Sequence, residues 1–187
     1  MNAKDNLENI VKELTTAVAY VEEKQVDCLV DTILEANHIF LVGAGRSGIA
    51  IRAFGNRLMH LGFSVSIVGE ITSPHTAAGD LLIVGSGSGE TESLVSLSQK
   101  AKNHGVKIGL VTMAKESAIA KQADVSVILP GTSPKLKGEV GSVSSIQPMG
   151  SMFEQMCFLI YDAVIMTLMK RLEQSAEEMF KRHANLE

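Results

Sequence analysis

The chain has 187 residues, of which 45% are hydrophobic and 20% charged, and its net charge is −4 at pH 7. This length supports one sizeable hydrophobic core, so we expect a single domain. The slightly acidic balance provides no basic field that would attract DNA or an anionic membrane, so we expect no nucleic-acid partner and no membrane partner. Any phosphate group must then be held by local contacts.

The cysteines and the apolar segments predict a cytoplasmic protein. Cys28 and Cys157 lie among apolar residues without C-x-x-C spacing, which predicts buried thiols in a reducing compartment. Residues 1–9 are polar and charged, unlike a signal peptide. The most apolar stretch, MFEQMCFLIYDAVIMTLM, is interrupted by Glu154 and Asp162, and we interpret it as too short and too punctuated to span a bilayer.

Two helices are predicted in residues 1–36, from the helical spacing of apolar residues between Leu7 and Val21 and then over about 26–35. Residues 37–130 alternate apolar runs with helical patterns. The runs are IFLVG, FSVSIVG, DLLIVGS, VKIGLVT and ADVSVILP, and the helical patterns cover 47–60, 90–103 and 116–121. This alternation predicts an α/β fold, a three-layer αβα sandwich around a five-stranded parallel sheet of flavodoxin-like order. Residues 131–150 are predicted to form a long functional loop. Residues 151–187 are predicted to form a last helix, over about 151–172, followed by a short tail.

A glycine-rich loop follows the first predicted strand. The stretch LVGAGRSG, residues 41–48, matches G-x-G-x-x-G, which also forms the pyrophosphate loop of nicotinamide or flavin enzymes. In that interpretation Glu70, after the second strand, would bind the ribose hydroxyls. A nicotinamide-dependent oxidoreductase is therefore one candidate class.

A second glycine-rich loop repeats the VGxG pattern 42 residues later, and a dinucleotide fold does not explain it. It continues as GSGSGET, which places Ser86, Ser88 and Thr91 where a helix is predicted to begin. Short hydroxyls, glycines and the positive end of a helix dipole suit a terminal phosphate dianion. Because no G-K-[ST] follows, a phosphomonoester is favoured over a triphosphate with Mg²⁺.

The pair GAGRSGIAIRAFGNRL and GDLLIVGSGSGET resembles the sugar isomerase (SIS) domain family, whose pattern has a G-x-G-x-S loop and then an S-x-S-G-x-T loop. Within it, IQPMGSMFEQ and the ending RHANLE resemble the 6-phospho-3-hexuloisomerases of the ribulose monophosphate pathway, over almost the whole chain. The resemblance implies an isomerase that interconverts D-arabino-hex-3-ulose 6-phosphate and fructose 6-phosphate. It also implies a homodimer or homotetramer that acts on a phosphorylated ketohexose without a cofactor.

The resemblance assigns roles to individual residues. It implies Glu154 as the proton-transferring base. Arabinose-5-phosphate isomerases, a sister family, carry a basic residue at the position of Arg46 and a C-terminal S-H-P-G-G stretch. The R-H-A-N of this chain loosely resembles that stretch but lacks its P-G-G. The resemblance makes His183 the second catalytic candidate, in a tail expected to close a site at a subunit boundary. The implied substrate binders are Gly45, Arg46, Ser47, Ser86, Gly87, Ser88, Gly89, Glu90 and Thr91.

The reaction can be argued from chemistry alone. Moving a carbonyl between C3 and C2 requires removal of a proton beside the carbonyl and its return to the neighbouring carbon, with an enediolate between the two steps. A single carboxylate over the C2–C3 bond can perform both transfers while a donor stabilises the oxyanion. This chemistry demands no metal, and the sequence has no acid or histidine cluster at ligand spacing.

Each candidate also has a structural interpretation. Ser151 to Glu154 fits an S-x-x-E capping box, in which Glu154 would only satisfy a backbone N–H. Arg46 could pair with an acid on a neighbouring helix, and His183 could be an ordinary tail residue. His60 is read as the end of a helix and His75 as an exposed loop residue. The function classes left open are an isomerase of this or the arabinose-5-phosphate type, a phosphosugar-binding regulatory module without turnover, and the oxidoreductase.

The last predicted helix bears on assembly. Its apolar residues between Phe153 and Met169 point in nearly every direction around the axis, which predicts a helix buried on all sides. One small domain cannot bury a surface helix in this way, so a homo-oligomer is expected.

Overall fold

A computed structural model describes residues 2–133 and 144–186. Its five strands form one parallel sheet in the order β2-β1-β3-β4-β5. This is the predicted flavodoxin-like order, and the α/β fold class is confirmed. The strands are β1 (Ile39–Gly43), β2 (Val65–Ile67), β3 (Leu81–Gly85), β4 (Lys107–Thr112) and β5 (Val125–Ile128).

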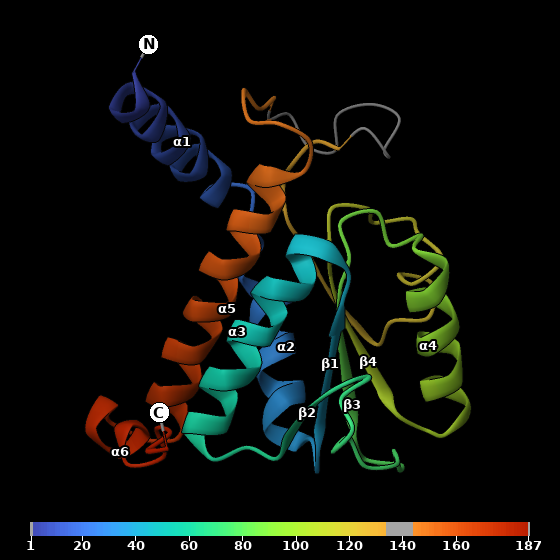
Figure 1. Ribbon diagram of the computed structural model, residues 1–187. Helices are drawn as coiled ribbons and strands as arrows, with labels where there is room; N and C mark the ends of the chain where they lie inside the picture. Colours follow the sequence, from blue (N-terminus) through green and yellow to red (C-terminus); the bar gives the residue numbers. More distant parts are fainter. Residues whose placement is uncertain (1, 134–143, 187) are drawn as a thin grey trace.

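Helices cover both faces of the sheet (Figure 1). On one face lie α2 (Glu23–Glu35), α3 (Gly45–Leu61) and α5 (Ser151–Arg171), and on the other lies α4 (Glu92–Asn103). Because successive strand residues face opposite sides, Ile39 and Leu41 of β1 join the core beneath α3, whereas Phe40 and Val42 join the core beneath α4. Burial on both faces explains why the strands are runs of Val, Ile and Leu.

The first glycine loop brings α3 close to the end of β1. A Cβ atom on Gly48 would lie 2.7 Å from the carbonyl oxygen of Gly43, so only glycine allows this approach. Gly45, the first residue of α3, has a φ of +58°, in the left-handed region that favours glycine. The glycines of GAGRSG thus set the helix start against the carboxyl edge of the sheet.

Three predicted elements differ from the structure. Residues 116–121 form turns rather than a helix, because they fold over the second glycine loop: Ile119 N–H donates to Gly89 O (3.1 Å) and Ala118 N–H to a carboxylate oxygen of Glu90 (2.8 Å). The helix expected from residue 90 begins at Glu92. The tail contains α6 (Ala176–Phe180), which starts with a capping box between Ser175 and Glu178.

The remaining differences concern the N-terminal helices and the loop before α5. Cys28 is exposed, not buried as predicted, because α2 turns Leu29, Val30 and Ile33 towards the core instead. The first helix, α1 (Ala3–Val18), projects from the body of the molecule (Figure 1). Of the predicted loop at 131–150, residues 134–143 lie outside the described residues.

Helix α5 has 21 residues and is long and apolar enough to cross a membrane, contrary to the expectation from its sequence. Length and composition are weak evidence here, because much of the helix is buried inside the molecule against α3, α1 and α2, as in the core helix of a soluble protein. Burial also raises the pKa of the Cys157 thiol on this helix, which keeps it protonated and inert.

Candidate active site

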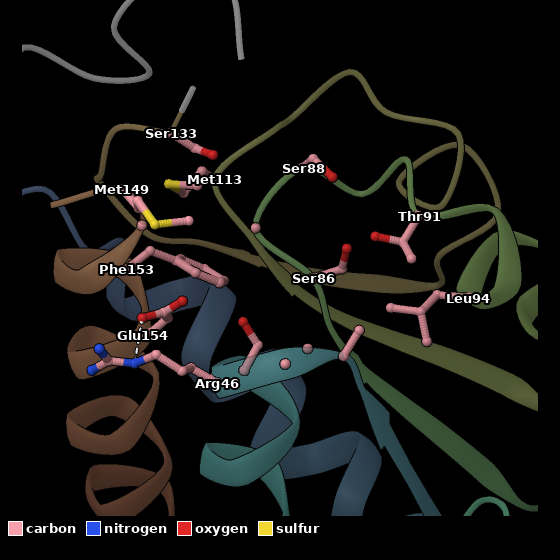
Figure 2. Close-up of a pocket in the computed structure, with 16 residues that line it drawn as sticks. Arg46, Ser86, Ser88, Thr91, Leu94, Met113, Ser133, Met149, Phe153 and Glu154 are labelled. Atoms are coloured by element: carbon pink, nitrogen blue, oxygen red, sulfur yellow. Dashed lines mark ion pairs between the residues drawn. The ribbon is translucent and has the colours of Figure 1, made fainter. Parts of the chain in front are cut away.

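The two glycine loops lie side by side at the carboxyl edge of the sheet. They are neighbours because β1 pairs directly with β3, with Gly43 opposite Gly85 where the loops begin. Together with the N-terminus of α5 they enclose a cavity of about 430 Å³ (Figure 2). Helices α3 and α4 both begin at these loops, so the positive ends of their helix dipoles favour an anion in the cavity.

Hydroxyl groups line the loop side of this cavity. Ser86 Oγ accepts a hydrogen bond from Gly89 N–H (3.1 Å), and Ser88 Oγ accepts one from Glu90 N–H (3.3 Å). Because each oxygen accepts from its own loop, its O–H remains to donate to a ligand. Thr91 is the N-cap residue of α4, but its side chain makes no capping bond. Ser47, in the first turn of α3, also lines the cavity.

The second loop is held in shape by its neighbour. Gly89 has a φ of +63°, and a Cβ atom there would overlap the Ser117 side chain. Gly89 and Glu90 themselves do not line the cavity, although the sequence nominated them as substrate binders. Through its bond to Ala118, Glu90 joins the loop to the 113–121 segment.

Glu154 faces the serines from the first turn of α5 (Figure 2). The N-cap of α5 is Gly150, which has no side chain to cap the helix, and Ser151 is already the first helical residue. The capping box that the sequence allowed between Ser151 and Glu154 is therefore not formed. Instead, Glu154 Oε2 lies 2.8 Å from Arg46 Nε, with 21% of the Glu154 side chain and 61% of the Arg46 side chain exposed. Arg46 thus does pair with an acid on a neighbouring helix, and that acid is the candidate base.

The other walls of the cavity were not found from the sequence. Met113, Met149 and Phe153 give it an apolar side between the serines and the carboxylate (Figure 2). The resemblance of IQPMGSMFEQ pointed to this segment without assigning these roles. The residues missed are Ala44, Gly85, Leu94, Met113, Ser133, Met149, Gly150 and Phe153.

The second catalytic candidate lies elsewhere in the chain. His183 follows α6, beyond the end of α5 opposite to Glu154 (Figure 1). Its ring is 5.4 Å from that of His60 and 5.5 Å from that of Phe180, measured between centroids. Burial, followed by the positive charge of Arg57 and by His183, lowers the pKa of His60. Within one chain, then, His183 and Glu154 are not brought together.

Two further observations bear on cofactors. Glu70, the acid of the dinucleotide interpretation, pairs with Arg52 of α3, with Oε1 and Nη2 2.6 Å apart. Among residues 2–133 and 144–186, no group of three or more His, Cys, Asp or Glu side chains is arranged to hold a metal ion.

The fold and the paired hydroxyl-bearing loops define a class of phosphosugar-binding α/β domain, and sequence comparison agrees: the SIS domain family matches residues 32–159, and the chain belongs to that family. Several relatives that match along the whole length are named 3-hexulose-6-phosphate isomerase. The protein of that name from Bacillus subtilis is 48% identical, over all of both chains. The one from Mycobacterium gastri is 40% identical over 98% of this chain and 90% of its own.

Solved structures agree with these relatives. A crystal structure from Methanococcus jannaschii, whose description infers a function as 3-hexulose-6-phosphate isomerase, has a TM-score of 0.82 and 36% identity over 98% of this chain and 99% of its own. The Vibrio vulnificus NanR protein complexed with ManNAc-6P is only 16% identical at a TM-score of 0.72, over 96% of this chain and 64% of its own. It therefore shows a shared fold alone.

Proposed function

We propose that this chain is an isomerase that interconverts D-arabino-hex-3-ulose 6-phosphate and fructose 6-phosphate by proton transfer through an enediolate. The whole-length identity to 3-hexulose-6-phosphate isomerases supports the reaction. The observation that carries the mechanism is a single carboxylate, Glu154, facing a hydroxyl-lined loop across one cavity.

In the proposed complex the phosphate binds at Ser47, Ser86, Ser88 and Thr91, with backbone N–H groups at the starts of α3 and α4. The sugar then extends across the cavity towards Glu154. From fructose 6-phosphate, Glu154 removes the C3 proton and the C2 carbonyl becomes an enediolate oxygen. Glu154, whose acquired proton exchanges in part with solvent, then delivers a proton to C2, while the O3 hydroxyl proton moves to O2 and C3 becomes the carbonyl. Water exclusion by Met113, Met149 and Phe153 strengthens the electrostatic contacts and protects the enediolate.

Arg46 has two roles in this proposal. Its ion pair holds Glu154 Oε2, which leaves Oε1, without a hydrogen-bond partner among the described residues, to accept the substrate proton. The guanidinium also supplies positive charge where the enediolate develops. The exposed Arg46 side chain can shift towards the substrate without breaking packing.

His183 acts, in this proposal, in the site of a neighbouring copy. A single chain leaves apolar side chains of α5 exposed, with Phe158 at 41%, Leu159 at 46% and Met166 at 70%. Exposed Ile49 and Phe158 line a smaller cavity, about 280 Å³, beside the Arg46–Glu154 pair. A second copy covering this face would bury it and bring a tail to the site. We expect a homodimer or homotetramer in the cytoplasm, and a monomer by light scattering at micromolar concentration would contradict it.

The reaction is tested by incubating the purified protein with fructose 6-phosphate in D₂O and following the sugar by NMR. Exchange at C3 is expected for the 3-hexulose reaction. Exchange at C1 would indicate an aldose product, as for an arabinose-5-phosphate isomerase type. Binding of fructose 6-phosphate without exchange would indicate a regulatory module, and both outcomes would contradict the proposal.

A further inference from the structure

Glu13 of α1 contacts the segment that leads into the active site. Its Oε2 accepts hydrogen bonds from Ser145 Oγ (2.9 Å) and Gln147 Nε2 (3.0 Å), and its Oε1 accepts one from Ile146 N–H (2.6 Å). One carboxylate thus holds three consecutive residues that are more than 130 positions away in the sequence. Hydrogen bonds to an ionised carboxylate are about twice as strong as those between neutral groups.

The held segment continues directly into the cavity wall. Two residues beyond Gln147, Met149 has a φ of +57°, a left-handed conformation that residues other than glycine rarely adopt. Such a conformation persists only where the surroundings impose it. On its other side, Ser151 N–H donates to Pro148 O (3.2 Å), which joins the turn to α5. Glu13 on one side and α5 on the other therefore fix Met149.

The turn at Met149 and Gly150 lies where it can contact the substrate. Met149 and Gly150 line the cavity beside Glu154, whereas Glu13 does not line it. The wall that they form stands where the sugar must extend from the phosphate loops to the carboxylate (Figure 2). A displacement of about 1 Å in a group that positions a substrate can change the rate on the order of 10²-fold.

We propose that Glu13 is a positioning residue of the isomerase, which holds residues 145–147 so that Met149 and Gly150 close the site over the substrate. The proposal rests on the proposed function. Glu13 acts through the segment alone and touches neither the sugar nor Glu154.

The test compares Glu13→Ala and Glu13→Gln with Glu8→Ala, a matched change at an exposed glutamate of the same helix. The rate of deuterium exchange at C3 of fructose 6-phosphate, measured against concentration, gives kcat and KM. For Glu13→Ala we expect kcat/KM to fall on the order of tenfold, with part of the loss in kcat. Glu13→Gln should recover part of it, because its carbonyl can still accept from Ile146. Glu8→Ala should match the parent.

A second readout does not depend on activity. Hydrogen exchange by mass spectrometry should show faster exchange in peptides covering residues 144–153 for Glu13→Ala, and not for Glu8→Ala, at unchanged oligomeric state. A parent protein without C3 exchange would refute the proposed function, and the peptide data would still decide the role of Glu13. The positioning role is overturned if Glu13→Ala keeps the parent kcat and KM, if its 144–153 peptides exchange at the parent rate, or if activity falls only in step with thermal stability and Glu13→Gln is no better.

Discussion

Two cavities of about 430 Å³ lie at opposite ends of α5, and their linings have different chemistry. The first is lined by two glycine loops, serine hydroxyls and the Arg46–Glu154 pair. The second is lined mostly by methionines and rings, with His60 and His183 among them. The two cavities have the same volume but suit different ligands, because their lining residues differ. The first is suited to a phosphosugar because helix starts and unshared O–H donors converge on it.

The comparison predicts its largest effect for Glu154→Gln. Glutamine keeps the size of the side chain and a hydrogen bond to Arg46 but cannot accept the substrate proton. We expect kcat to fall on the order of 10²-fold or more, because positioned proton transfer contributes about that much. The matched control is Asp162→Asn, at the second cavity on the same helix. C3 exchange measures the rate, and calorimetry should show fructose 6-phosphate binding nearly unchanged.

A different result for Glu154→Gln would show that the first cavity does not differ from the second by holding the catalytic base. If it turns over at the parent rate, or loses activity only in step with its melting temperature, Glu154 is not the base. The base must then be sought at His183 or at Glu90, whose carboxylate accepts a hydrogen bond from Ala118 N–H.

Ser88→Ala tests the phosphate side of the first cavity. The variant removes one donor that acts equally in the ground state and the transition state, so KM should rise while kcat stays near the parent value. A hydrogen bond to a charged group contributes about 1.5–3 kcal/mol, which corresponds to a KM increase of roughly tenfold or more. Ser96→Ala, at an exposed position on α4, is the control. A fall in kcat at constant KM would place Ser88 in the chemistry instead.

His183→Ala tests whether the two ends meet in an assembly. If the tail of one copy serves the site of another, we expect an intermediate loss of kcat, on the order of tenfold for one net hydrogen bond of about 1.4 kcal/mol. Mixing His183→Ala with Glu154→Gln should then restore activity, because a hybrid oligomer contains a site with both groups intact. Native mass spectrometry verifies the exchange of subunits. Hybrids that form without added activity would show that His183 has no role across subunits.

The sequence predicted what local patterns determine. The strands were found because burial on both faces leaves long apolar runs, and the two glycine loops because close approach excludes side chains, as Gly48 shows. The S-x-x-E pattern was misleading at Ser151, where Gly150 is the N-cap, whereas at Ser175, where no box was predicted, the structure does form one. The sequence allowed an ion pair for Arg46 but could not identify Glu154 as its partner, nor predict the Glu13 contacts, since these join residues far apart in the sequence that only the fold brings together.

The smallest expected effect concerns the second cavity and its pH dependence. His60 is buried beneath Arg57, His183 and Arg182, whose Nη1 donates to His60 O (2.9 Å), and Asp162 lines the same cavity from α5. Burial lowers the pKa of His60 in the folded state. Below about pH 6.5, the ordinary pKa of a histidine, the unfolded chain therefore binds a proton at His60 more readily than the folded chain does.

The neutral His60 therefore contributes stability that is fully present above that pH and is lost as the pH falls below it. Three carboxyl groups have a lowered pKa, and all titrate below this window. They are Glu35 bonded to Lys107, Asp124 bonded to Lys102 and the Ile108 N–H, and Glu178 bonded to the Ser175 N–H. Between pH 7.5 and 5.5 we expect the melting temperature to fall by an additional amount on the order of 2 °C in the parent compared with His60→Asn, whose side-chain oxygen can still accept from Arg57. Scanning calorimetry at constant ionic strength measures it, and equal falls in both proteins would show that His60 does not control the stability of this end of α5.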